Sequence, residues 1–560
     1  MQAAYTEKTS TRQASGQPRA RAASPAHRPL SASARLQLTL AGVLAFLLLW
    51  AGLSWWKASP LQLPAPWSVA SALRELAADG DLWANAGISV QRVLLSLVIS
   101  ALLAVPLGLL MGLSRRAEQL VDPLVEILRP ISGIAWIPLA LFIFGVGDAL
   151  PIFILVYVAT FQLLLATVAG VKSVDSKLMS AARIMGISQR AIVLHVVLPA
   201  ALPHLMAGLR LAFAASWSAI VAAELIGAPS GVGFAIEWYR QLLMTPKVFA
   251  FIAVIGLIGY VSDLTLRALQ EQLAPADRQL PSSSGAAPAV QRNGGGFQRI
   301  AGLCNSLLLP ALLVAAWQIW TLTLPAQSQA PSPLRVVEAF LALTSSGQLP
   351  AALVQSLGRV GVGFAIALAL AVPIGIVMGR SAIVQGLLNP IVEGFRPIAP
   401  MAILPIAILW LGTGTPTAYA IVAYAAFFPI LINTVASVAR LDRRLLRAAD
   451  TMGIRRWPLL LRIVLPGALP NILLGARIGM GVAWTAIIAA ELAVGSASGG
   501  GSSGGIGQMM FVFYSYSVDL NGIVVCMIVV GVVALLIDRL FRIAEKRLMP
   551  WRFTLSLIHI

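Results

Sequence analysis

Two acidic residues stand inside long apolar runs, where a charge is costly. Glu224 and Glu491 each follow a tryptophan, Trp217 or Trp484, within an otherwise apolar stretch. Charged side chains at membrane depth usually face the interior of a helix bundle or a cavity. We expect these four residues to shape a gate or pathway. The alternative is a structural hydrogen bond for the acids, and packing or interface anchoring for the tryptophans.

Other residue types offer little reactive chemistry. The chain has four histidines and two cysteines, and neither set has the spacing of a metal site, a disulfide framework or a catalytic triad. The phosphate-binding pattern G-x-x-x-x-G-K-[ST] does not occur anywhere in the sequence. The sequence therefore predicts no enzyme, no metal and no cofactor. Energy must come from a separate polypeptide or from an ion gradient.

The bulk composition places these residues in a membrane. Of 560 residues, 58% are hydrophobic and only 11% are charged. Apolar runs long enough to cross about 30 Å of hydrocarbon recur along the chain. The net charge of +18 does not indicate nucleic-acid binding, because the Lys and Arg residues lie in short loops between the apolar runs. We predict an all-α, polytopic helical membrane protein that contacts lipid and no nucleic acid.

A motif in the basic loops occurs twice, at a constant shift of 267 positions (453 − 186). Each copy has two adjacent alanines, a glycine and a Leu-Pro pair, and the residues are Ala181, Ala182, Gly186, Leu198 and Pro199, then Ala448, Ala449, Gly453, Leu465 and Pro466. Prolines, glycines, arginines and glutamates elsewhere match at the same shift, which indicates a true duplication. We expect each copy to form a helix–turn–helix, in which the glycine ends the first helix and, in the first copy, Ser188 caps the second.

The repeat divides the chain into two halves of six spans each. We expect spans near 38–56, 88–113, 130–147, 150–170, 203–226 and 248–268, and near 302–324, 357–379, 396–413, 417–437, 470–494 and 521–541. The basic loops that hold the motifs are expected in the cytoplasm. Both motifs then face one side, which requires an even number of spans per half and a cytoplasmic N-terminus. The halves form a parallel repeat, related by an axis along the membrane normal.

The expected domain boundaries follow the repeat. Residues 1–35 are predicted to be a disordered N-terminal segment, and residues 36–270 form the first domain. Residues 271–300, rich in Pro, Ser and Gly, are predicted to be a flexible linker. Residues 301–552 form the second domain, and residues 553–560 are expected to be an artefactual tail.

The duplicated motif resembles the signature loop of permease subunits of binding-protein-dependent ATP-binding-cassette (ABC) importers. Arg129-Pro130-Ile131 and Trp217-Ser218 resemble the nitrate/sulfonate/taurine/bicarbonate branch of that family. The resemblance implies two fused type I importer permease domains in the bacterial cytoplasmic (inner) membrane. In that family the loop is a coupling helix that sits in a cleft of the ATPase, so this role falls on both copies of the motif. Ser180 and Arg447 stand where the family usually has Glu, so the two docking sites need not be equivalent.

The resemblance also implies the function and the partners. The function would be the permease component of an ATP-driven importer for a small anionic solute such as sulfonate, nitrate, taurine or bicarbonate. The partners would be two ABC ATPase subunits, identical or a heteromeric pair, and a periplasmic or lipid-anchored solute-binding protein. The alternative is an ion-driven secondary transporter or channel, which would show paired intramembrane acids and broken helices and need no nucleotide-hydrolysing partner.

Overall fold

The computed structural model describes residues 32–549, apart from residues 58, 60, 274–295, 326–329 and 498–503. The regular elements in this part of the chain are helices. Nine helices there are long and apolar enough to cross a membrane, or up to eleven if each of two bent helix pairs counts as one span. The predicted all-helical membrane fold is therefore confirmed. The expectations for residues 1–31, for most of the linker and for residues 553–560 lie outside the described residues.

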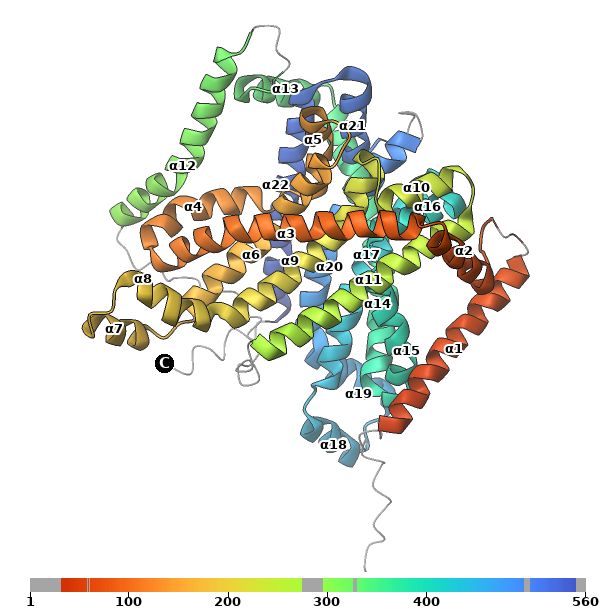
Figure 1. Cartoon of the computed structure of the whole chain (residues 1–560). Coiled ribbons are helices and arrows are strands. Elements are labelled where there is room, and N and C mark those ends of the chain that lie inside the picture. Colours follow the sequence, from red (N-terminus) through yellow and green to blue (C-terminus); the bar gives the residue numbers. More distant parts are fainter. Residues whose placement is uncertain are drawn as a thin grey trace, which may run out of the picture.

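Each half contributes a set of long helices that the duplication relates. In the first half these are α1 (Ala32–Lys57), α3 (Asp81–Leu113), α6 (Ala149–Lys172), α9 (Leu198–Gly227) and α11 (Thr245–Leu273). In the second half they are α12 (Gly296–Thr323), α14 (Gln348–Arg380), α17 (Thr415–Ala439), α20 (Leu465–Ala497) and α22 (Leu520–Leu548). Shorter helices α2 (Pro66–Ala78) and α13 (Pro333–Ser345) follow the first long helix of each half. In Figure 1, α3, α6 and α9 run across the view, whereas α14 and α17 run down it.

The expected third spans, near 130–147 and 396–413, are each part of a pair of helices joined at a sharp bend. In the first half α4 (Arg115–Leu128) meets η1 (Gly133–Trp136) and α5 (Ile137–Phe144) at 79°, and in the second half α15 (Ala382–Phe395) meets α16 (Pro400–Leu411) at 93°. Each break contains a proline, Pro130 or Pro397, which has no N–H to continue the helical ladder.

A tyrosine of the same half stabilises each break. Tyr157 Oη donates to the carbonyl oxygen of Leu128 at 2.6 Å, and Tyr424 Oη donates to that of Phe395 at 2.8 Å. Each carbonyl also accepts from a backbone N–H beyond the bend, Ile131 N at 3.0 Å or Ile398 N at 3.1 Å, so the tyrosine adds a second hydrogen bond at the end of the helix.

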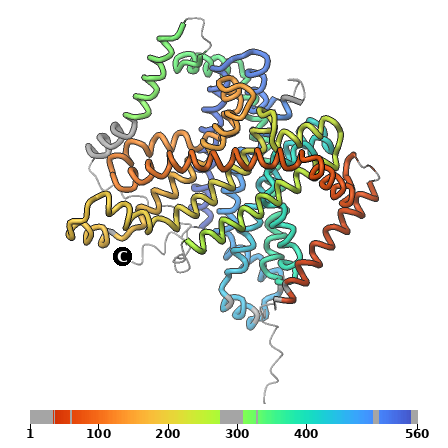
Figure 2. Tube along the Cα trace, in the orientation of Figure 1, coloured from red at the N-terminus to blue at the C-terminus, as the bar shows by residue number. Residues whose placement is uncertain are grey.

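The first long helix of each half packs against the other half. α1 contacts α15, as the trace in Figure 2 shows. α12 likewise contacts α4. A Cβ on Gly42 of α1 would lie 2.1 Å from the carbonyl oxygen of Leu387, so the two backbones approach closely. The rings of Phe46 and Phe395 meet edge to face at 5.5 Å. The two halves are therefore interlocked.

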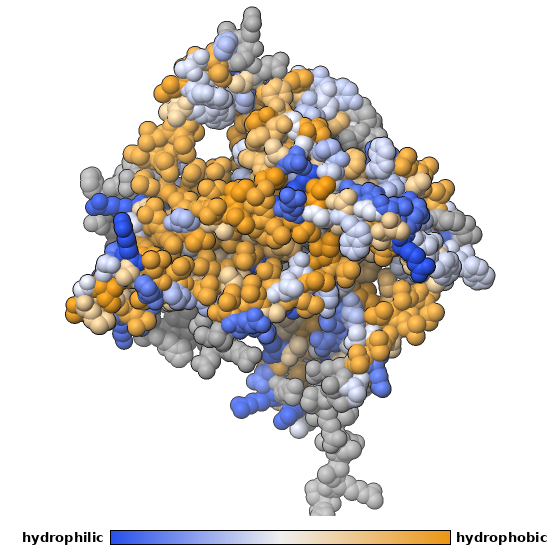
Figure 3. Space-filling view, in the orientation of Figure 1, coloured by the Kyte–Doolittle hydropathy of each residue, from blue (hydrophilic) through white to orange (hydrophobic). Residues whose placement is uncertain are grey.

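Apolar side chains cover much of the outside of the helical body. Figure 3 shows a broad hydrophobic belt, with hydrophilic patches gathered toward the ends of the bundle. Leucines of the span α3, such as Leu102 and Leu103, are more than half exposed. Such a surface fits hydrocarbon rather than water.

Candidate functional site

The structure folds each copy of the repeated motif into the same hairpin, which we call a knuckle (first knuckle, residues 175–199; second knuckle, residues 442–466). The first knuckle begins with α7 (Ser176–Ile184) and the second with α18 (Arg443–Thr451). Gly186 and Gly453 end these helices with φ of +73° and +69°. Ile187 N donates to Ala182 O, and Ile454 N donates to Ala449 O, both at 3.1 Å. This is the glycine-terminated Schellman arrangement, which explains the spacing between the second alanine and the glycine.

The two alanines of each knuckle face opposite ways. Ala182 and Ala449 are 3% and 2% exposed and pack inside their own knuckles, whereas Ala181 and Ala448 are exposed. The second alanine is therefore small because the hairpin closes on it. Only the first alanine of each pair is placed to touch a partner.

Each knuckle is joined to a long helix without a break. After the turn, α8 (Gln189–Ile192) passes through a wide turn, η2 (Val193–Val197), into α9, and the whole run Gln189–Gly227 forms one span. In the second half, α19 (Arg456–Leu459) and η4 (Leu460–Val464) lead into α20 in the same way. Ser188 Oγ accepts from Ala191 N at 3.4 Å, so the predicted cap of the second helix is confirmed. Leu198 and Leu465 start the long helices, and Pro199 and Pro466 follow in their first turns, where proline is tolerated.

The knuckle tips expose apolar side chains at the same end of the molecule. Ile184 and Met185 are 86% and 70% exposed, and Met452 and Trp457 are 78% and 73% exposed. Figure 1 places α7 and α18 away from α10 (Val232–Gln241) and α21 (Ile506–Val512). We call the two ends the knuckle end and the far end.

Glu224 is buried toward the far end of α9, and three donors surround its carboxylate. Ser89 Oγ lies 2.8 Å from both carboxylate oxygens, and Arg92 Nη1 donates to Oε1 at 2.7 Å. The backbone N–H of Gly233 donates to Oε2 at 3.0 Å. The pairing and the hydrogen bonds satisfy what a buried charge requires.

The second half repeats this arrangement around Glu491. Ser356 Oγ lies 2.9 and 2.8 Å from the two oxygens, Arg359 Nη1 donates to Oε1 at 2.8 Å, and Gly507 N donates to Oε2 at 3.1 Å. We call the two sets carboxylate cradles. The first cradle is Ser89, Arg92, Glu224, Gly231 and Gly233, and the second is Ser356, Arg359, Glu491, Gly505 and Gly507.

Glycines let the backbone approach the acids. A Cβ on Gly231 would lie 2.2 Å from Glu224 Oε1, and one on Gly505 would lie 2.0 Å from Glu491 Oε1. α10 and α21 begin directly after these glycines. Each cradle therefore ties the start of a far-end helix to the long helix that leads to a knuckle.

The basic partners of the two acids, Arg92 and Arg359, were not predicted from the sequence. Arg92 and Arg359 match at the same shift as the acids and lie in apolar helices, and this shared register was the signal that could have paired them. The acids and broken helices expected of an ion-driven transporter are both present. However, each carboxylate is held by arginine, serine and a backbone N–H, which suits a structural joint.

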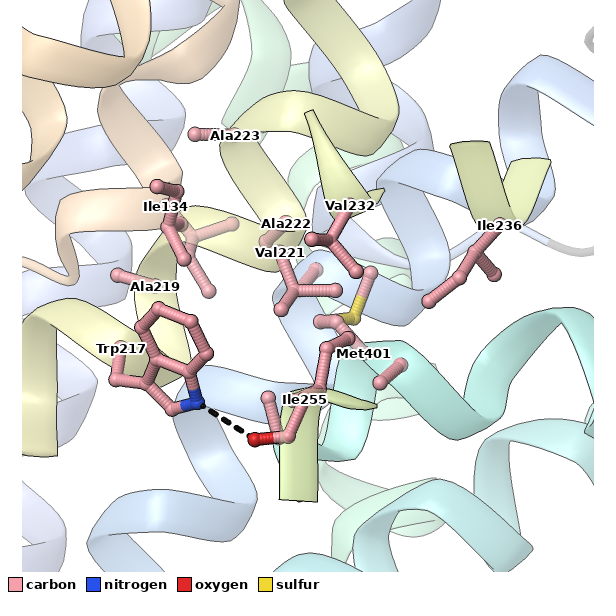
Figure 4. Packing of buried hydrophobic residues seen from close by; sticks show 14 of the residues in the cluster. Ile134, Trp217, Ala219, Val221, Ala222, Ala223, Val232, Ile236, Ile255 and Met401 are labelled. Atoms are coloured by element: carbon pink, nitrogen blue, oxygen red, sulfur yellow. Dashed lines mark hydrogen bonds between the residues drawn. The ribbon is translucent and has the colours of Figure 1, made fainter. Parts of the chain in front are cut away.

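Trp217 and Trp484 are packing residues that join neighbouring helices. They are 3% and 2% exposed. Trp217 Nε1 donates to Ile255 O at 3.2 Å, and Trp484 Nε1 donates to Val530 O at 3.1 Å. Figure 4 shows Trp217 reaching Ile255 of α11 within the buried cluster. One side of Trp217 also borders a cavity between the halves.

That cavity has a volume of about 400 Å³ and is lined by both halves, among others by Arg210 and Asp263 of the first half and Arg396 of the second. We call it the near cavity. Its charged groups form two pairs. Arg210 Nε lies 2.6 Å from Asp263 Oδ1, and Arg396 Nη1 lies 3.5 Å from Glu393 Oε2. The two arginines balance the two acids.

A second cavity of about 310 Å³, the far cavity, lies between α10 and α21. Its charged lining residues are Glu237 and Arg240, with Arg240 Nε 2.8 Å from Glu237 Oε2. The hydrogen bond to Glu237 raises the pKa of Arg240 above its usual value, so this arginine stays charged. Phe511 and Tyr514 of the second half form part of the opposite wall.

A buried apolar layer separates the two cavities. On α9 the near cavity reaches Ser218 and the far cavity begins at Leu225, a separation of about 10 Å along the helix. The layer contains small or apolar side chains from both halves, among them Ala219, Val221, Ala222 and Met401 (Figure 4), with Ala486, Ala489 and Ala490. The described structure is closed between the cavities.

Comparison with known proteins identifies the family. The model for the binding-protein-dependent transport system inner membrane component matches residues 104–275 and again residues 371–550. The taurine transport system permease protein TauC of Escherichia coli is 38% identical over 259 residues, which cover 44% of this chain and 91% of TauC.

Two further relatives match in the same way. SsuC of Bacillus subtilis, named for aliphatic sulfonates transport, is 33% identical over 280 residues, covering 50% of this chain and 97% of that protein. The bicarbonate transport system permease protein CmpB of Synechococcus elongatus is 34% identical over 246 residues, covering 42% of this chain and 87% of CmpB. The chain is a multi-pass membrane protein and a transport subunit, not itself an ATPase, and it belongs to the family of binding-protein-dependent ABC importer permeases with that domain present twice.

Proposed function

We propose that this single chain forms the whole translocation pathway of an ATP-driven importer, with a separate ATPase subunit docked on each knuckle. The knuckle end is then cytoplasmic and the far end faces a solute-binding protein. The observation that carries the proposal is the pair of apolar tips at one end, with Ile184 at 86% and Met452 at 78% exposure. Exposed apolar groups of this kind mark protein contacts.

The continuous helices support transmission of ATPase closure. A rigid-body tilt of the first knuckle moves the run Gln189–Gly227 as a unit, because no loop interrupts it. That run carries one wall of both cavities and part of the layer between them. Alternating access then consists of opening this layer when both knuckles move together.

The proposed solute is a small molecule with an anionic head group. The relatives are named for transport of taurine, aliphatic sulfonates and bicarbonate. The two cavities, of about 400 and 310 Å³, are of the size that holds a small solute. Glu224 and Glu491 act in this proposal as positioning residues for the far-end helices, and Trp217 and Trp484 hold the long helices to their neighbours.

The test replaces an exposed knuckle methionine by a charge. Met185→Asp and Met452→Asp should each lower solute-stimulated ATP hydrolysis of the assembled importer by about tenfold or more, as loss of an apolar contact anchor does. Met185→Leu and Met452→Leu are the matched controls, because they keep an exposed apolar side chain of similar size at the same positions. Full uptake in both knuckle variants, or the absence of any nucleotide-hydrolysing protein from the native complex, would contradict the proposal.

A further inference from the structure

Four tryptophans are exposed at the far end of the first half, and we call them the tryptophan corner. Trp55 and Trp56 lie in the last turn of α1, Trp67 lies at the start of α2, and Trp83 lies at the start of α3. Their exposed fractions are 86%, 77%, 67% and 68%. The end of α1, the helix α2 and the start of α3 meet at one corner of the molecule (Figure 1). So much exposed aromatic surface in one place marks a contact.

The second half has a different surface at the matching place. A shared hydrogen bond fixes the alignment there, because Trp50 Nε1 donates to Pro64 O at 3.0 Å and Trp317 Nε1 donates to Pro331 O at 2.9 Å. In that register the residues that match the tryptophan corner are Leu322, Thr323, Leu334 and Pro350. The duplicated fold therefore forms without these tryptophans, which points to a role that belongs to the first half alone.

The tryptophan corner continues a surface that faces lipid. Leu47, Leu48 and Leu49, one to two turns earlier on α1, are exposed, and the outside of the helical body is a hydrophobic belt (Figure 3). Lys57 ends the helix directly after Trp56. The indoles thus lie where an apolar span gives way to a charge. Tryptophan favours this level of a membrane, because its ring is apolar and its Nε1 is a hydrogen-bond donor.

The short helix α2 has the pattern of a helix that lies in the plane of the interface. Val69 and Leu76 are buried against the body of the protein, whereas Trp67 and Arg74 are exposed. Trp67 and Arg74 are two turns apart, so they share one side of the helix. A helix with an apolar side and a charged side next to a span lies along the head-group layer, where Arg74 can meet lipid phosphates.

A chain of polar contacts begins at α2 and leads inward. Lys247 Nζ donates to Glu75 Oε1 at 2.7 Å, and it also lies 5.2 Å from the centre of the Tyr239 ring, where a cation is attracted. Tyr239 Oη donates to Asp81 Oδ2 at 2.6 Å. These contacts join α2 to α11, then α11 to α10, and then α10 to the start of α3.

The chain of contacts ends at the first cradle. Asn85 Nδ2 donates to Asp81 Oδ1 at 2.8 Å, and Asn85 Oδ1 accepts from the backbone N–H of Gly231 at 2.9 Å. Gly231 belongs to the first cradle and directly precedes α10. The residues of the second half that match Glu75, Asp81, Asn85 and Tyr239 are Ala342, Gln348, Ala352 and Phe513. The tryptophan corner and the polar chain are thus differences that the same half carries together.

We propose that the tryptophan corner is an interfacial anchor that binds the lipid head-group layer at the far end, and that the polar chain passes this restraint to α10. The anchor then holds α10 at a fixed depth in the membrane. The residues that would build the same connection to α21 are replaced, so the two far-end helices are restrained differently. This inference holds for any transported solute and does not depend on the importer function.

The first test measures where the indoles lie, with the purified full chain in lipid nanodiscs. The nanodiscs contain phosphatidylcholine that carries bromine, a fluorescence quencher, either near the head group or near the chain end. The chain has 14 tryptophans, so the signal of the corner is the emission lost in Trp55→Leu/Trp56→Thr/Trp67→Leu, which introduces the residues of the second half. We expect the shallow bromines to quench this emission at least about twofold more than the deep ones.

The matched control is Trp457→Leu. Trp457 is 73% exposed, as the corner residues are, but it lies on the second knuckle directly after Arg456. The emission lost in this variant should be quenched by acrylamide in the water and be insensitive to bromine at both depths. If the emission of the corner behaves like that of Trp457, its indoles face water. That result overturns the anchor and leaves the surface open to a soluble protein.

The second test measures the connection to α10 by hydrogen–deuterium exchange in the same nanodiscs. The triple tryptophan variant should speed amide exchange in α10 by about threefold or more and leave α21 unchanged, because it removes a restraint on α10 alone. Tyr239→Phe, which introduces the residue of the second half, should do the same with the tryptophans in place. Unchanged exchange in α10 in either variant, or an equal rise in α10 and α21, overturns the connection.

Discussion

The two carboxylate cradles agree closely, while the surfaces around them differ. The serine, arginine and glycine contacts to Glu224 and Glu491 match to within 0.1 Å for most pairs. Arg92 additionally lies 2.5 Å from Asp148, whose position in the second half is Thr415. The two knuckles differ in charge between the halves, and the far-end helices differ in both charged and aromatic residues.

The comparison separates what the architecture requires from what each half can vary. A buried charge must be paired in any working copy, because an unpaired one is strongly destabilising. Exposed positions carry no such requirement, and there the two halves differ in sequence. The same buried frame can therefore carry two surfaces that are not equivalent.

The largest expected effect comes from removing one cradle arginine. Arg92→Met and Arg359→Met each leave a buried glutamate without its cation, and we expect a loss of about 3–5 kcal/mol in each case. Thermal melting of the detergent-solubilised chain, followed by size-exclusion chromatography, measures this. The double variant Arg92→Met/Glu224→Met should recover most of the loss. A wild-type melting temperature in the single variants would show that the cradles do not hold the fold.

The next largest effect is expected at the cradle glycines, where the two halves differ in backbone conformation. Gly231→Ala and Gly505→Ala both place a methyl group against the carboxylate, but Gly231 has φ of +109° whereas Gly505 has φ of −106°. The first substitution adds backbone strain of roughly 1–3 kcal/mol to the clash, so it should be the more damaging. Gly87→Ala is the control, since nothing lies within 4 Å of its added Cβ. The same melting assay checks the ranking, and equal losses would contradict it.

The knuckles should respond unequally to charge. Arg447 is exposed on α18, whereas the matching residue on α7 is Ser180. Arg447→Glu should weaken ATPase binding about tenfold, or roughly 1.4 kcal/mol, because it reverses a charge at the proposed interface. Ser180→Ala should change the affinity by less than about twofold. Titration of each purified variant with the ATPase subunit measures both, and equal effects would mean equivalent docking sites.

The smallest effect is expected at the extra carboxylate of the first half. Asp148 has a side chain that is 72% exposed, so its pair with Arg92 is worth less than about 1 kcal/mol. Asp148→Asn should barely change the melting temperature, and Thr415→Asp should add little to the second half. A large loss in Asp148→Asn would show that the first cradle depends on this exposed group.

Much of the fold could be read from the sequence, because its signals are local. Apolar runs, the constant shift of the repeat and the Ala-Ala…Gly spacing predicted helices, halves and knuckles. The bends at Pro130 and Pro397 were not predicted, because the length of an apolar run indicates a span but does not indicate whether the helix changes direction within it. Tyr157 and Tyr424, which donate hydrogen bonds to the helix ends at these breaks, lie on a different helix.

The candidate site was only partly readable for a related reason. Glu224 and Glu491 could be singled out because each is a charged residue in an apolar run. The arginines that pair with them lie on α3 and α14, far away in the sequence. The cavities depend on how the halves meet, and no single segment records this. The sequence also did not indicate which alanine of a pair is exposed. Ala182 is buried and Ala181 is exposed because of how the first knuckle packs.

The exchange of first helices between the halves has a consequence for synthesis. α1 ends at Lys57, yet its partner α15 begins only at Ala382. At roughly 5–20 residues per second, the ribosome needs on the order of tens of seconds to make the intervening chain. During that interval α1 sits in the bilayer with Gly42 facing lipid instead of the Leu387 backbone. A nascent chain stalled before α15 should therefore expose a glycine-notched helix that quality-control proteases of the membrane can recognise.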